Sequence, residues 1–245
     1  MTSPIKFCIF ASISKQHFMQ LPEGKKIYFA SDFHLGIPDR KSSIERELRL
    51  CKWFDEIKQD AAIIFLVGDL FDVWFEYKHV VPKGHVRFLG KLAELSDLGI
   101  QIEIFAGNHD LWVQDYFEDE MNIKVHHEPL RCEFNNKQFY IAHGDGLGPG
   151  DHGYKILKKI MTNKISQWLY RRLHPNLGIS IATYFSQRGP KHTDSEPAFL
   201  GEEKEWLVQF AKSILLKEKI DFFIFGHRHI ALLYPIGESL YVNLG

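Results

Sequence analysis

Short apolar runs rich in β-branched and aromatic residues recur along the chain, and each ends at a glycine, a histidine or a carboxylate. Such runs are typical of buried strands. The five clearest cover residues 27–30, 61–67, 100–106, 139–142 and 220–225, and two further runs cover 231–236 and 240–244. Helical apolar spacing marks residues 86–98 and 202–218, and also the segment after a capping box at residues 42–45. Alternating strands and helices predict an α/β fold.

Residues of metal-ligand type follow five of these runs directly. The motifs are Asp32-Phe33-His34, Gly68-Asp69, Gly107-Asn108-His109-Asp110, His143-Gly144-Asp145 and Gly226-His227-Arg228-His229. In open α/β sheets, ligands bind beyond the carboxyl ends of the strands. Residues two apart in extended backbone point to one side, so Asp32 with His34, and His227 with His229, can each face one site. The glycines that accompany these motifs permit positive φ and close backbone approach.

Carboxylate and imidazole ligands without a thiolate favour manganese, iron, zinc or cobalt over calcium or a structural zinc. Seven candidate ligands favour two ions over one, because a catalytic ion must keep positions open. Taken singly, an Asp after a strand is usually a turn or a helix cap, and Gly-Asp is a common turn dipeptide. Five such coincidences after five strands favour the metal site.

Composition limits the remaining function classes. A chain of 245 residues with 45% hydrophobic content can bury a sizeable core, which favours one domain spanning 1–245 with an N-terminal extension at 1–24. Thirty Lys and Arg against 31 Asp and Glu give a formal net charge of -1, which argues against nucleic-acid binding. Cys8, Cys51 and Cys132 share no short spacing, which favours reduced thiols in the cytoplasm. No apolar run approaches the roughly 20 residues that cross a bilayer.

The ordered motifs resemble the calcineurin-like metallophosphoesterase family from about Lys26 to the C-terminus. This resemblance implies a two-sheet β-sandwich flanked by helices, with a dinuclear metal centre at one end. It implies that His109 acts beside the phosphate and that Asp110 supports His109. A simple helix or loop cap before Leu111 and Trp112 is the alternative interpretation of Asp110. The implied ligands are Asp32, His34 and His229 for the first ion, Asn108, His143 and His227 for the second, and Asp69 as the bridge between them.

Three stretches are similar to those of bacterial UDP-2,3-diacylglucosamine diphosphatases of lipid A biosynthesis: residues 31–36, 68–75, and 143–146 followed by Asp151 and Tyr154. Well-known members of that group carry Arg at the position of His109, so the resemblance is closer to a His-bearing branch. It implies hydrolysis of the nucleotide-lipid diphosphate to UMP and 2,3-diacylglucosamine 1-phosphate, with Mn²⁺ as the favoured metal. The alternative is a phosphodiesterase or phosphatase acting on soluble nucleotides or other phosphoesters.

Residues 152–192 contain eight Lys and Arg but no Asp or Glu, and they interrupt the strand and helix alternation. We expect a helical cap there. Apolar residues near one face predict a basic amphipathic helix at 154–173, suited to an anionic membrane surface and to a peripheral position on the cytoplasmic side of the inner membrane. A core-packed helix with a solvated face is the alternative. The candidate substrate contacts are Asp151, Ser186, Arg188 and Lys191.

The aromatic stretch after Asp69 has two interpretations. Trp74, Phe75 and Tyr77 suit either a hydrophobic wall beside the site or ordinary core packing. Glu76 and Asp115 are assigned to the surface.

Overall fold

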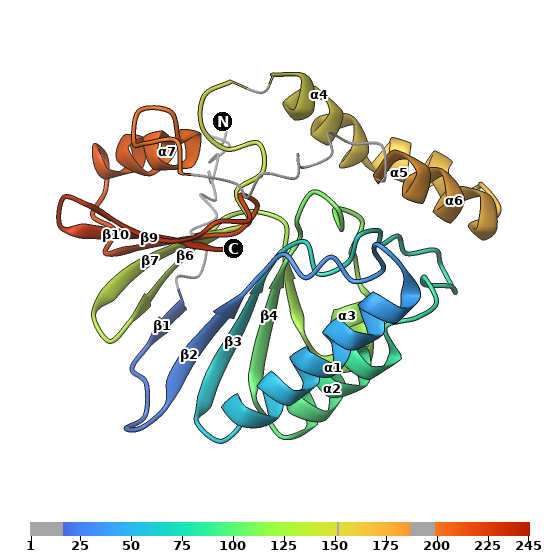
Figure 1. Ribbon diagram of the computed structural model, residues 1–245, viewed down its shortest axis with the longest axis horizontal. Coiled ribbons are helices and arrows are strands. Elements are labelled where there is room, and N and C mark those ends of the chain that lie inside the picture. The colour runs from blue at the N-terminus through green and yellow to red at the C-terminus, as the bar shows by residue number, and fades with distance from the viewer. Residues whose placement is uncertain (1–16, 151, 187–198) are drawn as a thin grey trace, which may run out of the picture.

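The computed structural model describes residues 17–150, 152–186 and 199–245, which form two β-sheets packed face to face with helices on their outer faces (Figure 1). The strands are β1 (His17–Met19), β2 (Lys26–Ala30), β3 (Ala61–Val67), β4 (Gln101–Phe105), β5 (Lys124–His126), β6 (Leu130–Phe134), β7 (Lys137–Ala142), β8 (Phe222–Phe225), β9 (Ala231–Ile236) and β10 (Ser239–Leu244). The helices are α1 (Arg40–Ile57), α2 (Val86–Asp97), α3 (Tyr116–Met121), α4 (His152–Met161), α5 (Lys164–Tyr170), α6 (Pro175–Ser186) and α7 (Trp206–Leu215). The expected α/β sandwich flanked by helices is confirmed.

The two sheets have different strand patterns. The smaller sheet has the order β2-β3-β4-β5, and every neighbouring pair is parallel. The larger sheet has the order β1-β6-β7-β8-β10-β9. The pairs β7-β8, β8-β10 and β1-β6 are parallel, whereas β6-β7 and β10-β9 are antiparallel. The seven predicted strands are all present. Parallel strands end at the same edge of a sheet, so the loops that follow them gather there.

The sequence of β3 is apolar throughout because both faces of its sheet are covered. Ile63, Phe65 and Val67 face the larger sheet and form the core between the two sheets. Ile64 and Leu66 alternate with them and pack under the outer helices. The helices α1, α2 and α3 cover this outer face, and α7 covers the outer face of the larger sheet (Figure 1).

Helix boundaries differ from the prediction in two places. The capping box at residues 42–45 does not begin α1: the helix begins at Arg40, and the Asp39 side chain caps it by accepting a hydrogen bond from the Ser42 N–H at 2.9 Å. The helix α7 is shorter than the predicted 202–218, because Glu205 stands at its N-cap. By contrast, α2 begins at the predicted residue.

The predicted cap consists of three helices, α4, α5 and α6. The prediction of a single helix at 154–173 is wrong, because α4 and α5 divide this segment. Asn163 breaks it, because its side chain accepts hydrogen bonds from the N–H groups of Ile165 and Ser166 and starts α5. The cap packs on the loops that follow β3 and β4. There the indole N–H of Trp112 donates to the Met161 carbonyl at 2.6 Å.

Of the two interpretations of the aromatic residues after Asp69, the structure supports core packing. Trp74 belongs to the core beneath the outer helices, and Phe75 packs with Trp112 and Tyr170 under the cap. Four short elements were not predicted: β1, which lies within the expected N-terminal extension, β5, β6 and α3. Among the described residues, no helix combines the length and apolar character needed to cross a bilayer.

Candidate metal centre

Five loops meet at one end of the sandwich, where β2, β3, β4, β7 and β8 end (Figure 1). Main-chain hydrogen bonds join them. The Asp32 N–H donates to the Gly68 carbonyl at 3.0 Å, and the Gly226 N–H donates to the His143 carbonyl at 2.9 Å. The His227 N–H donates to the Asp32 carboxylate, at 3.1 Å to each oxygen. The loops of the two sheets are therefore linked at this point.

A first group of donor atoms comes from Asp32, His34, Asp69 and His229, and these atoms lie within 4.8 Å of one another. The His34 Nε2 atom is 3.1 Å from His229 Nε2, 3.9 Å from Asp32 Oδ1 and 3.7 Å from Asp69 Oδ2. His229 Nε2 is 3.3 Å from Asp32 Oδ1. Because metal–nitrogen and metal–oxygen bonds are about 2.0–2.2 Å long, separations of this size suit ligands of one ion.

A second group shares Asp69 with the first and adds His143 and His227. His143 Nε2 lies 3.3 Å from Asp69 Oδ2 and 3.1 Å from the Asn108 side-chain oxygen. The other ring nitrogen of His143 donates to the Val67 carbonyl at 2.9 Å, which leaves Nε2 facing the centre. All seven residues predicted as ligands thus come together, with Asp69 between the two groups.

The backbone at five of these residues is left-handed. The φ angles are 56° at Asp32, 42° at His34, 52° at Asp69, 67° at His227 and 51° at His229. Such values are uncommon outside glycine and mark strained, functional loops. The expectation that Asp32 and His34 share a side through extended backbone is therefore wrong: tight turns bring them together. His227 and His229 divide between the two groups.

Glycine is required at this site for two different reasons. Gly68 has a φ of 85°, and a Cβ there would also collide with the His143 ring. Gly107 does not have positive φ, but a Cβ on it would collide with the Asp69 carboxylate. Close approach, rather than an unusual φ, therefore explains the second glycine.

The electrostatics of the centre suit cations. Burial lowers the pKa of His34 and of His227 to about 4, so both rings stay neutral near pH 7 with a lone pair available. Burial opposes charge on Asp69 as well, but His143 holds the pKa of that carboxyl well below its usual range. Burial likewise opposes charge on His143, whose pKa the Asp69 carboxylate raises. Positive charge is thus favoured between these two side chains, and the donor set fits two divalent cations.

His109 lies beside the first group but is held by Asp72. Its Nδ1–H donates to the Asp72 carbonyl at 3.0 Å, and Nδ1 is 3.4 Å from Asp72 Oδ1. Burial opposes charge on the ring, yet the hydrogen bond to Asp72 and the charge of Asp69 outweigh burial and raise the pKa of His109 to about 9. His34, Asp72 and His109 form a third cluster of candidate donors.

The Asp110 carboxylate does not hold the His109 ring, so the prediction that Asp110 supports His109 is wrong. Its carboxylate accepts hydrogen bonds from the main-chain N–H groups of Gly107 at 2.6 Å, Leu70 at 2.7 Å and Asp69 at 3.3 Å. Burial raises the pKa of Asp110 to about 7. Asp110 therefore positions the loops that carry the candidate ligands.

The cap reaches the centre through Ser186, the last residue of α6. The Ser186 hydroxyl donates to Asp72 Oδ1 at 2.7 Å and lies 3.4 Å from His109 Nδ1. The other predicted substrate contacts, Asp151, Arg188 and Lys191, lie outside the described residues.

Sequence reasoning missed Asp72, which lies beside His109, although its spacing of three after Asp69 was an available signal. The assignment of Glu76 to the surface is wrong, because Glu76 is buried. Its carboxylate accepts from Trp74 Nε1 at 2.9 Å and from three N–H groups at the start of α3, those of Gln114, Asp115 and Tyr116. Asp115 is exposed, as predicted.

Comparisons with known proteins identify the family of this chain. The family model for calcineurin-like phosphoesterase matches residues 25–231. The chain is 38% identical over 218 residues to the UDP-2,3-diacylglucosamine hydrolase of Porphyromonas gingivalis, which covers 84% of this chain and 83% of that protein. It is 26% identical over 212 residues to the protein of the same name from Histophilus somni, covering 84% of each.

A solved structure, the phosphopantetheinyl hydrolase of Mycobacterium tuberculosis, aligns with a TM-score of 0.41 at 12% identity and covers 90% of this chain and 88% of that chain. The family model spans all seven candidate ligands and most of the chain. This chain belongs to the calcineurin-like phosphoesterase family.

Proposed function

We propose that this chain hydrolyses the diphosphate of UDP-2,3-diacylglucosamine to UMP and 2,3-diacylglucosamine 1-phosphate, a step of lipid A biosynthesis. The observation that carries the reaction type is the pair of donor groups that share Asp69. The substrate assignment is supported by the Porphyromonas gingivalis relative, whose similarity extends over 84% of this chain.

The ligand roles follow the two groups. Asp69, which belongs to both groups, would hold both ions, because a carboxylate offers two oxygens and a negative charge between two cations. Mn²⁺ is the proposed metal, and the absence of thiolates from both groups supports it over softer ions. When bound, a metal pair supplies Lewis acidity toward the phosphoryl oxygens and activates a water molecule. The remaining ligands are Asp32, His34 and His229 on one side and Asn108, His143 and His227 on the other.

His109 donates a proton or a hydrogen bond to charge that develops on the phosphoryl or leaving oxygen. Its Nδ1 is fixed by Asp72, so Nε2 is the atom that faces away from that contact. General acid catalysis of this kind contributes about 10²–10⁴-fold in rate. Asp110 acts one step further away, since it holds the loops that carry Asp69 and Gly107.

The cap supports a lipid substrate. Ile156 and Ile165 are 63% and 69% exposed, and Phe185 on α6 is 69% exposed. These residues come from all three cap helices, and so many exposed large apolar side chains in one segment are typical of an interaction surface. The others on the cap helices that share this exposure are Leu157, Ile160, Trp168, Leu169, Leu177 and Tyr184.

These side chains are suited to acyl chains and to an anionic bilayer that the neighbouring lysines attract. We accordingly propose a peripheral position on the cytoplasmic face of the inner membrane. Ser186, beside His109, is the proposed substrate contact within the described residues. Asp151, Arg188 and Lys191 remain proposed contacts.

The test is an incubation of the full chain with detergent-dispersed UDP-2,3-diacylglucosamine and Mn²⁺, with the products read by mass. We expect UMP and the lipid sugar phosphate in equal amounts, and no products from Asp69→Asn. A strong preference for bis(p-nitrophenyl) phosphate, without release of UMP from the lipid, would favour the alternative of a soluble-phosphoester hydrolase.

A further inference from the structure

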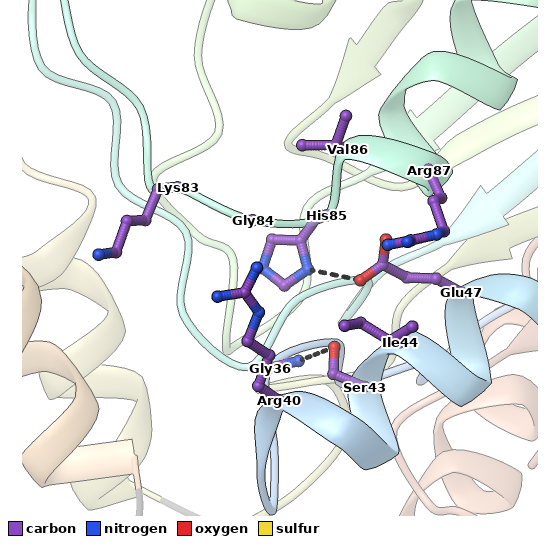
Figure 2. Close-up of a pocket in the computed structure, with 10 residues that line it drawn as sticks. All are labelled: Gly36, Arg40, Ser43, Ile44, Glu47, Lys83, Gly84, His85, Val86 and Arg87. Carbon is purple, nitrogen blue, oxygen red and sulfur yellow. Dashed lines mark hydrogen bonds and ion pairs between the residues drawn. The ribbon is translucent and has the colours of Figure 1, made fainter.

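A cleft of about 390 Å³ lies between the N-terminal ends of α1 and α2 (Figure 2). This volume is within the range of small-molecule sites. Gly36, two residues after His34, forms one edge, and its N–H donates to Ser43 Oγ at 3.0 Å. A Cβ on Gly36 would lie 3.8 Å from both Asp72 Cβ and His85 Cε1. The cleft therefore adjoins the aspartate that holds the proposed general acid.

Two buried polar atoms line this cleft without a hydrogen-bond partner in the described part of the chain: Glu47 Oε2 and His85 Nδ1. The Glu47 side chain is only 3% exposed. Its other oxygen, Oε1, is 3.9 Å from His85 Nδ1, which is beyond hydrogen-bond distance. Figure 2 shows the carboxylate of Glu47 on α1 and the ring of His85 pointing toward one another. A buried carboxylate oxygen without a hydrogen-bond donor is costly in free energy. Glu47 and His85 are therefore suited to a ligand that supplies hydroxyl groups.

The surroundings of the pair are positive. The helix α2 begins after His85 without any side-chain cap, so the first N–H groups of a 12-residue helix lack a side-chain acceptor next to the cleft. Three cations, Arg40, Lys83 and Arg87, line the cleft and are exposed. Exposed side chains change rotamer within nanoseconds, so the two arginines can move to admit a ligand. Helix N-termini with nearby cations are suited to a phosphate group.

We infer that this cleft binds the ribose phosphate of the nucleotide half of the substrate, with Glu47 and His85 facing ribose hydroxyls and with Arg40, Arg87 and the start of α2 attracting phosphate. The inference rests on the proposed function and adds to it the site for the nucleotide. Acyl chains do not suit the cleft, because they would leave Glu47 and the cations unpaired. The nucleotide thus occupies the cleft between α1 and α2, and the lipid occupies the cap.

The experiment measures inhibition of bis(p-nitrophenyl) phosphate hydrolysis by UMP, 2′-deoxyUMP and inorganic phosphate, using the full chain loaded with Mn²⁺. We expect UMP to bind more tightly than phosphate, and deoxyUMP about tenfold more weakly than UMP, as loss of a hydrogen bond to a charged group predicts. Glu47→Gln should reduce this UMP preference to about threefold or less, because a neutral amide replaces the carboxylate. Each inhibition constant is compared within one variant, so differences in basal rate do not enter.

Arg87→Ala tests the phosphate side on an exposed residue, where folding is not at risk. It should weaken UMP about tenfold and raise the KM for the UDP-lipid. Arg49→Ala is the matched control, because Arg49 is exposed on α1 and does not line the cleft.

The inference is overturned if UMP inhibits the unmodified chain no better than phosphate, or if Arg87→Ala changes UMP binding no more than Arg49→Ala does. It is also overturned if Glu47→Gln, with an unchanged melting temperature, weakens UMP and deoxyUMP equally. The proposed function fails separately: absence of UMP release from the UDP-lipid, with UMP inhibition and its Arg87 dependence intact, refutes the lipid substrate and leaves the nucleotide site standing.

Discussion

Asp72 provides the sharpest test of how the proposed general acid is held. The change is Asp72→Asn, which keeps the shape of the side chain and removes its charge. In the structure, Asp72 Oδ1 lies 3.4 Å from His109 Nδ1 and accepts from Ser186 at 2.7 Å. The Asp72 carboxylate is therefore expected to stabilise positive charge on the imidazole, whereas the Asp72 carbonyl, which the substitution keeps, fixes the direction of Nε2.

The size of the effect follows from this geometry. A hydrogen bond to a charged group contributes about 1.5–3 kcal/mol, and 1.36 kcal/mol corresponds to a tenfold change in rate. A separation of 3.4 Å places the Asp72 contact at the weak end of that range, since hydrogen bonds are strongest near 2.9 Å. We therefore expect kcat/KM to fall about 10- to 30-fold. Ser186→Ala removes only a neutral donor and should cost about 2- to 5-fold.

The assay is hydrolysis of bis(p-nitrophenyl) phosphate at saturating Mn²⁺, with metal content measured on the same samples. Asp97→Asn is the matched control, because Asp97 is exposed at the end of α2. We expect Asp72→Asn to keep two ions per chain and an unchanged melting temperature. Loss of an ion would show that Asp72 is itself a ligand, and a fall of less than about threefold would show that its carboxylate does not stabilise charge on His109.

Three further predictions concern the ion pair of Glu205 with Arg228, the buried carboxylate of Glu76 and the metal ions. Glu205→Gln breaks the buried pair with Arg228 and should cost about 2 kcal/mol in urea unfolding at pH 7. Burial opposes charge on Glu205, but Arg228 lowers the pKa of its carboxyl. The stabilisation by this pair is therefore present above the ordinary glutamate pKa and is lost as pH falls through the lower pKa of the folded state. A difference in unfolding free energy between the two proteins that stays constant down to about pH 3 would contradict this. Glu76→Ala leaves the N–H groups at the start of α3 without their acceptor and should cost about 3 kcal/mol by the same measurement, whereas a cost below about 1 kcal/mol would show that water replaces it. Removing metal with a chelator should abolish hydrolysis and lower the melting temperature, because the ions bind only the folded chain; full activity in verified metal-free protein would refute the dinuclear centre.

Strong local patterns made most of the fold predictable. The run at 61–67 is apolar at every position, and both faces of the corresponding strand are covered in the structure. Short elements such as β1 and β5, with three residues each, carry too little periodicity to be recognised. The break in the cap depends on one side chain, Asn163, that competes with an otherwise continuous amphipathic pattern.

The candidate ligands were predictable because each one follows its strand within a few residues. The residues that hold His109 and the surrounding loops were not predictable, because their partners are distant in sequence. Asp72 and Ser186 are 114 positions apart, and Glu76 reaches N–H groups 38 to 40 positions away. Asp110 illustrates the same limit: adjacency to His109 suggested a partnership, whereas its carboxylate turns toward main-chain groups, two of them about 40 residues earlier.

The left-handed backbone at five ligand positions restricts how this centre can change over evolutionary time. Aspartate, asparagine and histidine enter that region several times more readily than other residues with a side chain. The same three residues supply all seven candidate ligands. A glutamate or a cysteine introduced to retune metal preference would have to adopt an unfavourable backbone before it could coordinate anything. Exchanges at Asp32, His34, Asp69, His227 and His229 should therefore remain within that small set of residues, whatever phosphoester a descendant of this chain comes to cleave.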